Sequence, residues 1–410
     1  MPSDAGLIWR QPRKPKVQVQ GAFLPLMRTA VRARPEDRNL LLDLIMVLSK
    51  EGQWREIVDR LASPMAGGLA PELAVELGVA ATHCGDLSLA RRALENAIDG
   101  RADEALRDPG GHIVARQRAC AELSSLLAAS GEDEAALRLV TDALDRNPRD
   151  EAALSMTVDL MLKRGDPTAV IVLLDDLERQ GVRSTLQLSC RANALGALGA
   201  HRELEEFVSP ARWCSETLIG GDLVDNRRLA EIILTHPELQ TSPRDRPTLG
   251  YNQRLVAVAS RGEPECRAVV SAIREHVDAY VASRRDQLHP VMALMPETAV
   301  LQGWALATSG NGHEPRHIHP KSWITAVYYL RVPAMKRNGT QPPPGSIVFG
   351  PWPGEIYPRA ARLPGWHIEP REGMLLIFPS FLAHSTIPSG TDELRLTVTL
   401  DVMRAGAPDA

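Results

Sequence analysis

Three histidines and one arginine near the C-terminus are residue types that could hold a metal ion and an anion. His317 and His319 stand two positions apart before an aromatic, β-branched run, and His384 and Arg395 follow later. Because residues i and i+2 of a strand point to the same side, His317 and His319 can aim at one point. With His384 from a distant strand, they would close a facial metal site with open positions. Non-heme Fe(II) binds a cosubstrate and O₂ in such a site.

The expected strand that begins at Arg395 adds a possible anion-binding face. Arg395 and Thr397 share one side of that strand. A buried guanidinium is costly unless it is paired, and beside a metal its natural partner is a carboxylate ligand held bidentately. Thr397 could donate a hydroxyl hydrogen bond to the same carboxylate.

Five apolar or alternating segments, separated by turns rich in proline and glycine, predict the strands that position these residues. Several short strands at this spacing suggest a sandwich or a jelly roll. A helical pattern over 263–285 precedes them. The expected strands cover residues 300–308, 323–332, 346–349, 373–378 and 394–402.

The first half of the chain is typical of helices, because Ala and Leu recur at helical spacing and aromatic residues are nearly absent. Turn-like glycines recur about every 34 residues, apart from one longer interval that we attribute to an insertion at 99–111. Small residues after these glycines, such as Ala90 and Ala136, would let paired helices approach closely. The pattern resembles the tetratricopeptide repeat family over 36–208, and another type of helical solenoid is the alternative. The glycines are Gly52, Gly85, Gly131, Gly165 and Gly199.

The ordered set of residues over 300–403 resembles the 2-oxoglutarate/Fe(II)-dependent oxygenases. It is similar to the putative 2OG-Fe(II) oxygenase group, which carries His-x-His-Pro and Tyr-Tyr-Leu, and to the aspartyl/asparaginyl β-hydroxylases. The resemblance implies that His317 and His384 bind the metal and that Arg395 binds the distal carboxylate of 2-oxoglutarate. His319 occupies a position where most of the superfamily has Asp or Glu. We expect it to complete a three-histidine site, and the alternative is iron held by two histidines and waters.

The same resemblance implies Fe(II), 2-oxoglutarate and O₂ as cofactor and cosubstrates, and hydroxylation of an unactivated C–H bond. Tyr328 is expected to offer its hydroxyl to 2-oxoglutarate, with core packing as the alternative. Four residues are expected to line the substrate pocket, although His313 could equally be a solvated loop residue. These are Trp304, His313, Ile324 and Phe381.

The patterns together predict an α+β multidomain chain. A disordered basic tail (1–20) would precede an all-α, tetratricopeptide-like solenoid (21–208). A helical transition that packs on the barrel (209–297) and a double-stranded β-helix, or jelly roll (298–405), would follow.

The composition argues against several other classes of protein. Apolar residues make up 44% and charged residues 24%, as in a globular protein, and the net charge of −4 gives no bulk attraction to nucleic acid. The five cysteines are scattered, which argues against a disulfide framework or a zinc ribbon. We expect neither a signal peptide nor a transmembrane helix, and hence a cytoplasmic protein.

Helical solenoids offer an extended surface for peptides, and the β-hydroxylases also couple helical repeats to an oxygenase domain. We therefore expect the substrate to be a peptide, a protein or a carrier-bound amino-acid side chain. One alternative is a free small molecule, such as an amino acid or a natural-product intermediate, with the repeats forming a homodimer. Two others are a non-catalytic adaptor with a vestigial barrel and a three-histidine dioxygenase that does not use 2-oxoglutarate.

Overall fold

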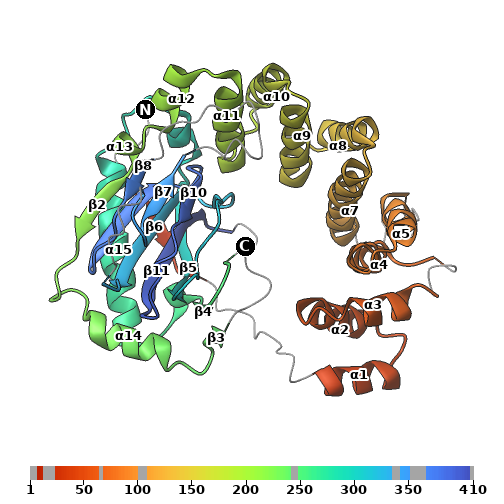
Figure 1. The fold of residues 1–410 in the computed structure, drawn as a ribbon, viewed down its shortest axis with the longest axis horizontal. Helices are drawn as coiled ribbons and strands as arrows, with labels where there is room; N and C mark the ends of the chain where they lie inside the picture. The colour runs from red at the N-terminus through yellow and green to blue at the C-terminus, as the bar shows by residue number, and fades with distance from the viewer. Residues whose placement is uncertain are drawn as a thin grey trace. The chain divides into compact units, whose positions relative to one another are not determined.

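The computed structural model describes residues 7–12, 24–63, 68–99, 109–241, 248–334, 342–350 and 366–406. Contacts within the chain divide it into two compact units, residues 17–164 and residues 1–16 with 165–410. The first unit is helical, and the second combines helices with two β-sheets (Figure 1). The expected order of helices followed by antiparallel β-structure is confirmed. The units divide at 164/165, whereas the sequence placed the boundary of the helical repeats at 208.

The helical unit consists of successive antiparallel pairs. Gly52, Gly85 and Gly131 lie between paired helices with φ of 67°, 79° and 81°, a conformation that glycine adopts without steric cost. Ala90 and Ala136 are completely buried, as expected for closely packed helices. The tetratricopeptide assignment stays a prediction. The helices are α1 Leu24–Ala33, α2 Arg38–Lys50, α3 Trp54–Leu61, α4 Pro71–His83, α5 Leu87–Asp99, α7 Pro109–Ala129, α8 Asp133–Arg146 and α9 Glu151–Lys163.

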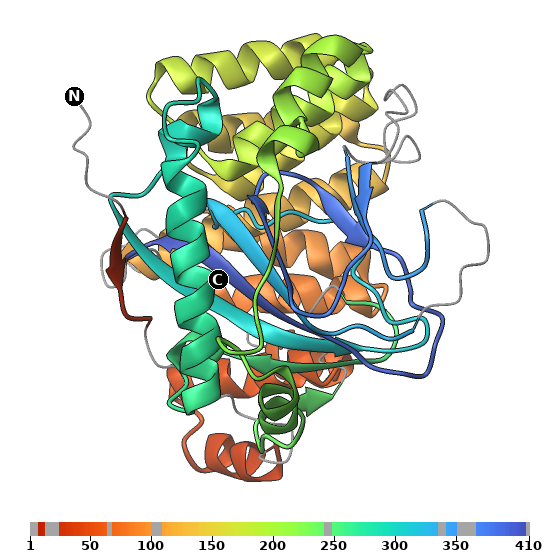
Figure 2. The same ribbon diagram turned by 90° about the vertical axis from the view of Figure 1, so that its left-hand side faces the viewer.

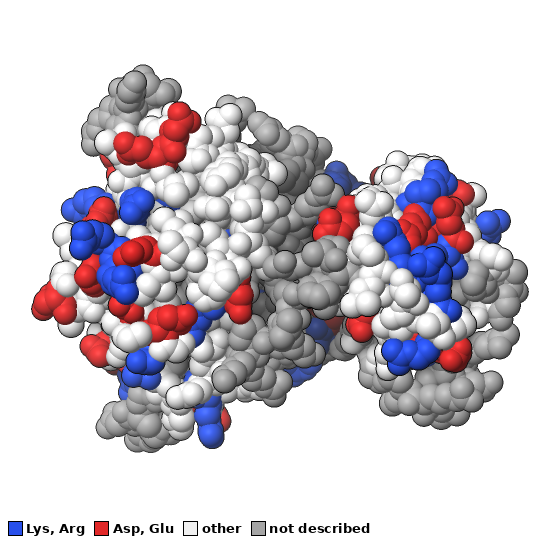
Figure 3. Space-filling model, turned by 90° about the horizontal axis from the view of Figure 1, so that it is seen from below, with Lys and Arg blue, Asp and Glu red and all other residues white. Residues whose placement is uncertain are grey.

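Acidic and basic side chains lie intermingled on the face of the helical unit that Figure 3 shows. Within this unit Arg28 and Arg60 both pair with Glu56, and Arg38 pairs with Glu72. Positive and negative charges therefore offset each other in these pairs.

The helices of the second unit pack around its sheets. Leu188 and Leu204, from the last expected repeats, belong to the same hydrophobic core as the strands, and the Thr185 hydroxyl donates to the Ser322 carbonyl at 2.6 Å. These contacts explain why the repeats after residue 164 group with the sheets. The helices are α10 Pro167–Arg179, α11 Thr185–Leu198, α12 His201–Val208, α13 Pro210–Trp213, α14 Asn226–Leu234 and α15 Pro264–Ala282, with short 3₁₀ turns η3 Val258–Ser260 and η4 Pro290–Leu294.

The strands form two sheets. The larger has the order β2-β9-β6-β11-β5-β4-β3, with β1 also paired to β5, and the smaller has the order β10-β7-β8. From β6 to β11 the chain passes twice from the larger sheet to the smaller one and back, with β7 and β8 both in the smaller sheet, as in a jelly roll. The strands are β1 Ile8–Arg10, β2 Ser215–Leu218, β3 Gln240–Thr241, β4 Asn252–Val256, β5 Thr298–Thr308, β6 Ile324–Arg331, β7 Ile347–Phe349, β8 Trp366–Ile368, β9 Met374–Pro379, β10 His384–Thr386 and β11 Arg395–Arg404.

The alternation of residues along β11 separates the two faces of the larger sheet. Arg395, Thr397 and Thr399 line a cavity on one face, while the intervening Leu396 and Val398 are completely buried in the core on the other. Helix α15 crosses that second face (Figure 2). Polar residues thus face the interior between the sheets, and apolar residues face the helices.

Four strands lie outside residues 298–405, the region that was expected to hold the β-structure. Residues 8–10 of the expected disordered tail form β1, which pairs in parallel with residues 298–300 of β5, beside the part of β5 that pairs with β4. The rest of that tail lies largely outside the described residues. The expected helical transition also contributes β2, β3 and β4, because the edges of β9 and β5 offer unpaired backbone groups. Among the described helices, none is long and apolar enough to cross a membrane.

Candidate functional site

The three predicted histidines converge in the second unit. His317 and His384 exchange two backbone hydrogen bonds of 2.9 Å in an isolated antiparallel bridge, and the His319 N–H donates to the Ser380 carbonyl at 3.2 Å. One ring nitrogen from each histidine lies within 4.8 Å of those of the others. Over the part of the chain that the structure describes, this is the one group of at least three potential ligands so arranged.

Hydrogen bonds set the orientation of each imidazole ring. In His317 and His384, Nδ1 donates to the backbone carbonyl two residues earlier, at 2.8 and 2.9 Å. In His319, Nδ1 donates to both carboxylate oxygens of Asp401, at 2.9 and 2.8 Å. Since a neutral imidazole carries one hydrogen, each ring keeps a lone pair on Nε2. Three such lone pairs around one point form a donor set suited to a metal cation.

The environment of the rings also bears on their charge. Burial, followed by the neighbouring imidazoles, holds the pKa of His384 well below its usual value, and burial lowers the pKa of His317. Burial acts to lower the pKa of His319 as well, but the charge and hydrogen bond of Asp401 outweigh it and raise the pKa. His317 and His384 are therefore neutral at neutral pH, the form that binds a metal.

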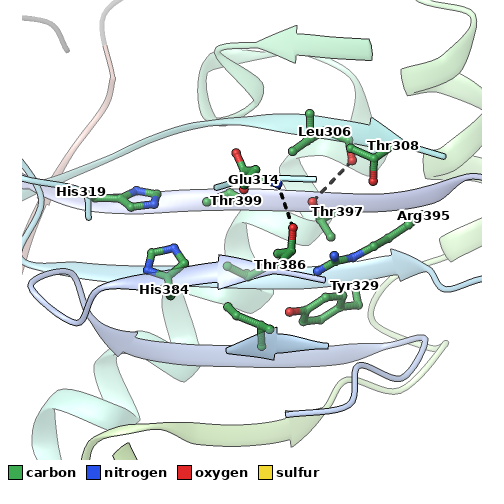
Figure 4. Close-up of a pocket in the computed structure, with 12 residues that line it drawn as sticks. Leu306, Thr308, Glu314, His319, Tyr329, His384, Thr386, Arg395, Thr397 and Thr399 are labelled. Carbon is green, nitrogen blue, oxygen red and sulfur yellow. Dashed lines mark hydrogen bonds between the residues drawn. The ribbon is translucent and has the colours of Figure 1, made fainter. Parts of the chain in front are cut away.

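A cavity extends from His319 and His384 between the two sheets (Figure 4). The cavity opens to solvent, and its empty space together with that open solvent is about 470 Å³. Leu306, Val327 and Ile347 form apolar walls. The cavity therefore combines apolar wall residues with His319 and His384 at one end.

Arg395 and Tyr329 line the end of this cavity away from His319 and His384. Arg395 is 8% exposed, and its guanidinium carbon lies 5.2 Å from the centre of the Tyr329 ring. Neither Arg395 Nε nor the buried Tyr329 hydroxyl has a hydrogen-bond partner among the described residues. Unpartnered buried polar groups are costly, and a guanidinium beside a hydroxyl fits a carboxylate. The residues thus fit a metal ion at one end and a small anion at the other.

Thr397 and Arg395 both line the cavity, so the prediction that they share a strand face agrees with the structure. The adjacent tyrosines require a correction. The Tyr328 hydroxyl points out of the cavity and donates to Asn226 Oδ1 at 2.6 Å, whereas Tyr329 faces into it. Thr325, Val327 and Tyr329 are the residues of β6 paired with the cavity-facing side of β11. Strand alternation therefore turns Ile324 and Tyr328 away, so Ile324 does not line the cavity either.

The other three expected pocket residues have different surroundings. Phe381 is buried against Phe207 and His289, at ring distances of 5.5 and 5.7 Å, and does not line the cavity. His313 is half-buried, forms an isolated antiparallel bridge with Leu249, and donates from Nδ1 to the Asn311 carbonyl. Trp304 is the one of the three near the histidines, since its ring stacks on His319 with centroids 5.7 Å apart. Arg254 also lies near this ring, with its guanidinium carbon 4.8 Å from the Trp304 ring centre.

Sequence reasoning did not propose Tyr329 or Asp401 as site residues. Glu314 lines the cavity and lies 3.4 Å from Arg254 Nη2. Asp401 could have been found by extending the two-residue spacing of Arg395 and Thr397 along the strand. No comparable local signal distinguishes Tyr329 from Tyr328.

Comparisons with known proteins concern the same region. The sequence model of a family described as "Putative 2OG-Fe(II) oxygenase" matches residues 302–401, from β5 to β11. No match was found among curated proteins.

Several solved structures resemble about half of the chain. A prolyl-4-hydroxylase of Pseudomonas putida is 17% identical, with 49% of this chain and 98% of that chain covered and a TM-score of 0.34. A Trichoplax adhaerens prolyl hydroxylase, in complex with a hypoxia-inducible-factor peptide fragment, is 16% identical, with 52% of this chain and 96% of that chain covered and a TM-score of 0.35. HygX of Streptomyces hygroscopicus, with nickel, 2-oxoglutarate and hygromycin B bound, is 14% identical, with 50% of this chain and 87% of that chain covered and a TM-score of 0.31. TM-scores below 0.5 give these resemblances no weight for the substrate.

The family match agrees with the residues in the cavity. It spans Arg395 and all three histidines, whose ring nitrogens face one point. Residues 302–401 are therefore a domain of the putative 2OG-Fe(II) oxygenase family, and the chain is an enzyme that uses Fe(II), 2-oxoglutarate and O₂.

Proposed function

We propose that this enzyme hydroxylates a C–H bond of an amino-acid side chain in a peptide, a protein or a carrier-bound substrate. The observation that carries the proposed chemistry is the cavity itself. Three imidazole nitrogens meet at one end. At the other end lie Arg395 Nε and the Tyr329 hydroxyl, both buried and without a hydrogen-bond partner among the described residues.

In this proposal His317, His319 and His384 hold Fe(II) through Nε2. The carbonyl and carboxylate acceptors on Nδ1 keep each ring in the form that can bind the ion. When bound, Fe(II) with 2-oxoglutarate and O₂ supplies the oxidising chemistry: one oxygen atom enters the substrate C–H bond, and the other enters 2-oxoglutarate as it loses CO₂ to give succinate.

Arg395 is proposed to bind the distal carboxylate of 2-oxoglutarate, with hydrogen bonds from Tyr329 and Thr397. Its low exposure makes the ion pair stronger than it would be in water. Leu306, Val327 and Ile347 keep water away from the cosubstrate. The positions of Arg395 and the histidines at opposite ends of the cavity set the direction in which the keto acid lies.

The helical hairpins support the choice of a peptide or protein substrate. Stacked helical pairs present extended surfaces, which suit a chain-like ligand better than a compact one. A free small molecule, with the repeats serving dimerisation, is the alternative. Retention of all three histidines and Arg395 disfavours the non-catalytic adaptor.

Anaerobic mixing with Fe(II) and 2-oxoglutarate tests the metal and cosubstrate roles. We expect a visible charge-transfer band that His384→Ala abolishes. The matched control is His201→Ala, because His201 is exposed on α12. A band that persists in His384→Ala, or no band in the wild-type protein, contradicts the proposed site.

Succinate formation from 2-oxoglutarate tests the class of substrate. We expect a library of peptides to stimulate succinate release and free amino acids to have no effect, with mass spectrometry locating an added oxygen on a side chain. Equal stimulation by a free amino acid would favour the small-molecule alternative.

A further inference from the structure

The proposed metal site differs in charge from the common arrangement of two histidines and one carboxylate. Three neutral imidazoles leave the full positive charge of Fe(II) uncompensated by a protein ligand. Among the described residues, no carboxylate belongs to the ligand cluster. Glu314 lines the cavity, but Arg254 Nη2 lies 3.4 Å from Glu314 Oε1 and offsets the charge of that carboxylate.

Asp401 supplies a carboxylate immediately behind one of the imidazoles. Both of its oxygens accept from His319 Nδ1, at 2.9 and 2.8 Å, and the side chains of Asp401 and His319 are 11% and 7% exposed. The charge is therefore close to the metal position and poorly screened by solvent.

Further contacts hold this pair in place. The hydroxyl of the completely buried Thr325 donates to Asp401 Oδ1 at 2.8 Å, and the Ser380 hydroxyl lies 2.8 Å from the Thr325 hydroxyl. Trp304 stacks on the His319 ring with an interplanar angle of 13°. The ring of His319 is thus fixed both along its hydrogen bond and across its face.

We infer that Asp401 is a positioning residue of the metal centre. It fixes His319 with its hydrogen on Nδ1, and supplies through that imidazole the negative charge that a carboxylate ligand would supply directly. The inference rests on the proposed function, because it requires His319 to bind the ion. It explains how a histidine can stand where most of the superfamily has Asp or Glu.

The test compares Asp401→Asn with Asp392→Asn in the full-length protein. Asp401→Asn removes the charge but keeps an oxygen acceptor for His319. Asp392→Asn makes the same change of charge at an exposed position before β11. We expect Asp401→Asn to weaken binding of Co(II) alone by about 10–100-fold. It should also move the band of the anaerobic Fe(II)–2-oxoglutarate complex to higher energy, because a less electron-rich imidazole makes Fe(II) harder to oxidise. Asp392→Asn should change neither.

Thr325→Val provides a second variant in case Asp401→Asn does not fold. It removes a donor from Asp401 and leaves the carboxylate a stronger acceptor for His319, so the band should move to lower energy. Unchanged Co(II) affinity and band energy in folded Asp401→Asn overturn the inference, even if thermal stability falls. If Asp401→Asn is unfolded, an unshifted band in Thr325→Val overturns it. Absence of the band from the wild-type protein contradicts the proposed function instead.

Discussion

The adjacent tyrosines of β6 lead to a paired prediction, because their side chains point to opposite faces of one strand. Tyr329 lines the cavity beside Arg395, and its hydroxyl has no partner among the described residues. Tyr328 donates to Asn226 Oδ1 at 2.6 Å, outside the cavity. Replacing each by Phe removes one oxygen atom and nothing else. The two substitutions should therefore affect different properties of the protein.

The expected size of each effect follows from these contacts. A hydrogen bond to a charged group contributes about 1.5–3 kcal/mol, so Tyr329→Phe should raise the Kd of 2-oxoglutarate about 10–100-fold. It should not lower the free energy of unfolding without ligand, since no hydrogen bond is lost. Tyr328→Phe should lower that free energy by roughly 1 kcal/mol, the usual net contribution of a hydrogen bond, and leave the Kd of 2-oxoglutarate unchanged.

Two measurements separate the effects. Anaerobic titration of the Fe(II) protein with 2-oxoglutarate, followed at the charge-transfer band, gives Kd. Urea unfolding of the metal-free protein gives the free energy of unfolding. Equal weakening of 2-oxoglutarate binding by both substitutions, or no weakening by Tyr329→Phe, would refute the assignment of the inward face.

Other predictions address charge, acid stability and sheet packing. Arg395→Met should weaken 2-oxoglutarate binding about 150–5,000-fold, since losing one partner of a buried ion pair costs about 3–5 kcal/mol. Arg404→Met, at an exposed position at the far end of β11, should leave the Kd unchanged. Similar Kd values for the two variants would count against Arg395. Burial lowers the pKa of His289 from 6.5 to about 4. As the pH falls, the unfolded chain therefore binds a proton first, and the free energy of unfolding should drop by about 3 kcal/mol in total between these pH values. Unfolding of His289→Gln at pH 7 and pH 5 should lack that part of the acid dependence, and an unaltered dependence would contradict the prediction. Gly303→Ala would place a methyl group 1.9 Å from the Thr399 carbonyl oxygen. It should lower the free energy of unfolding by about 1–3 kcal/mol or more through overpacking, and weaken 2-oxoglutarate binding by displacing β11. Gly262→Ala, where an added methyl group would have nothing within 4 Å, is the control in both assays.

The residues proposed to bind the metal and the cosubstrate could be named from the sequence because local spacing and the family resemblance point to the same residues. His317 and His319 share a side through the two-residue repeat of extended chain, as do Arg395 and Thr397. The helix-pairing glycines were equally readable, since a positive φ between two helices favours glycine wherever it occurs. Along the chain, such patterns indicate which residues act together but not which face of a sheet they occupy.

The face was decided by the tertiary structure. The choice between Tyr328 and Tyr329 depends on the pairing of β6 with β11, about 70 residues later, and a shift of one residue in that register would exchange the two side chains. Asp401 meets His319 only because β11 lies beside β6 and behind the histidine segment. Strand β1 exists because distant residues of β5 offer it backbone partners. Local patterns fix the direction of a side chain relative to its neighbours, whereas only the pairing of distant strands fixes what it meets.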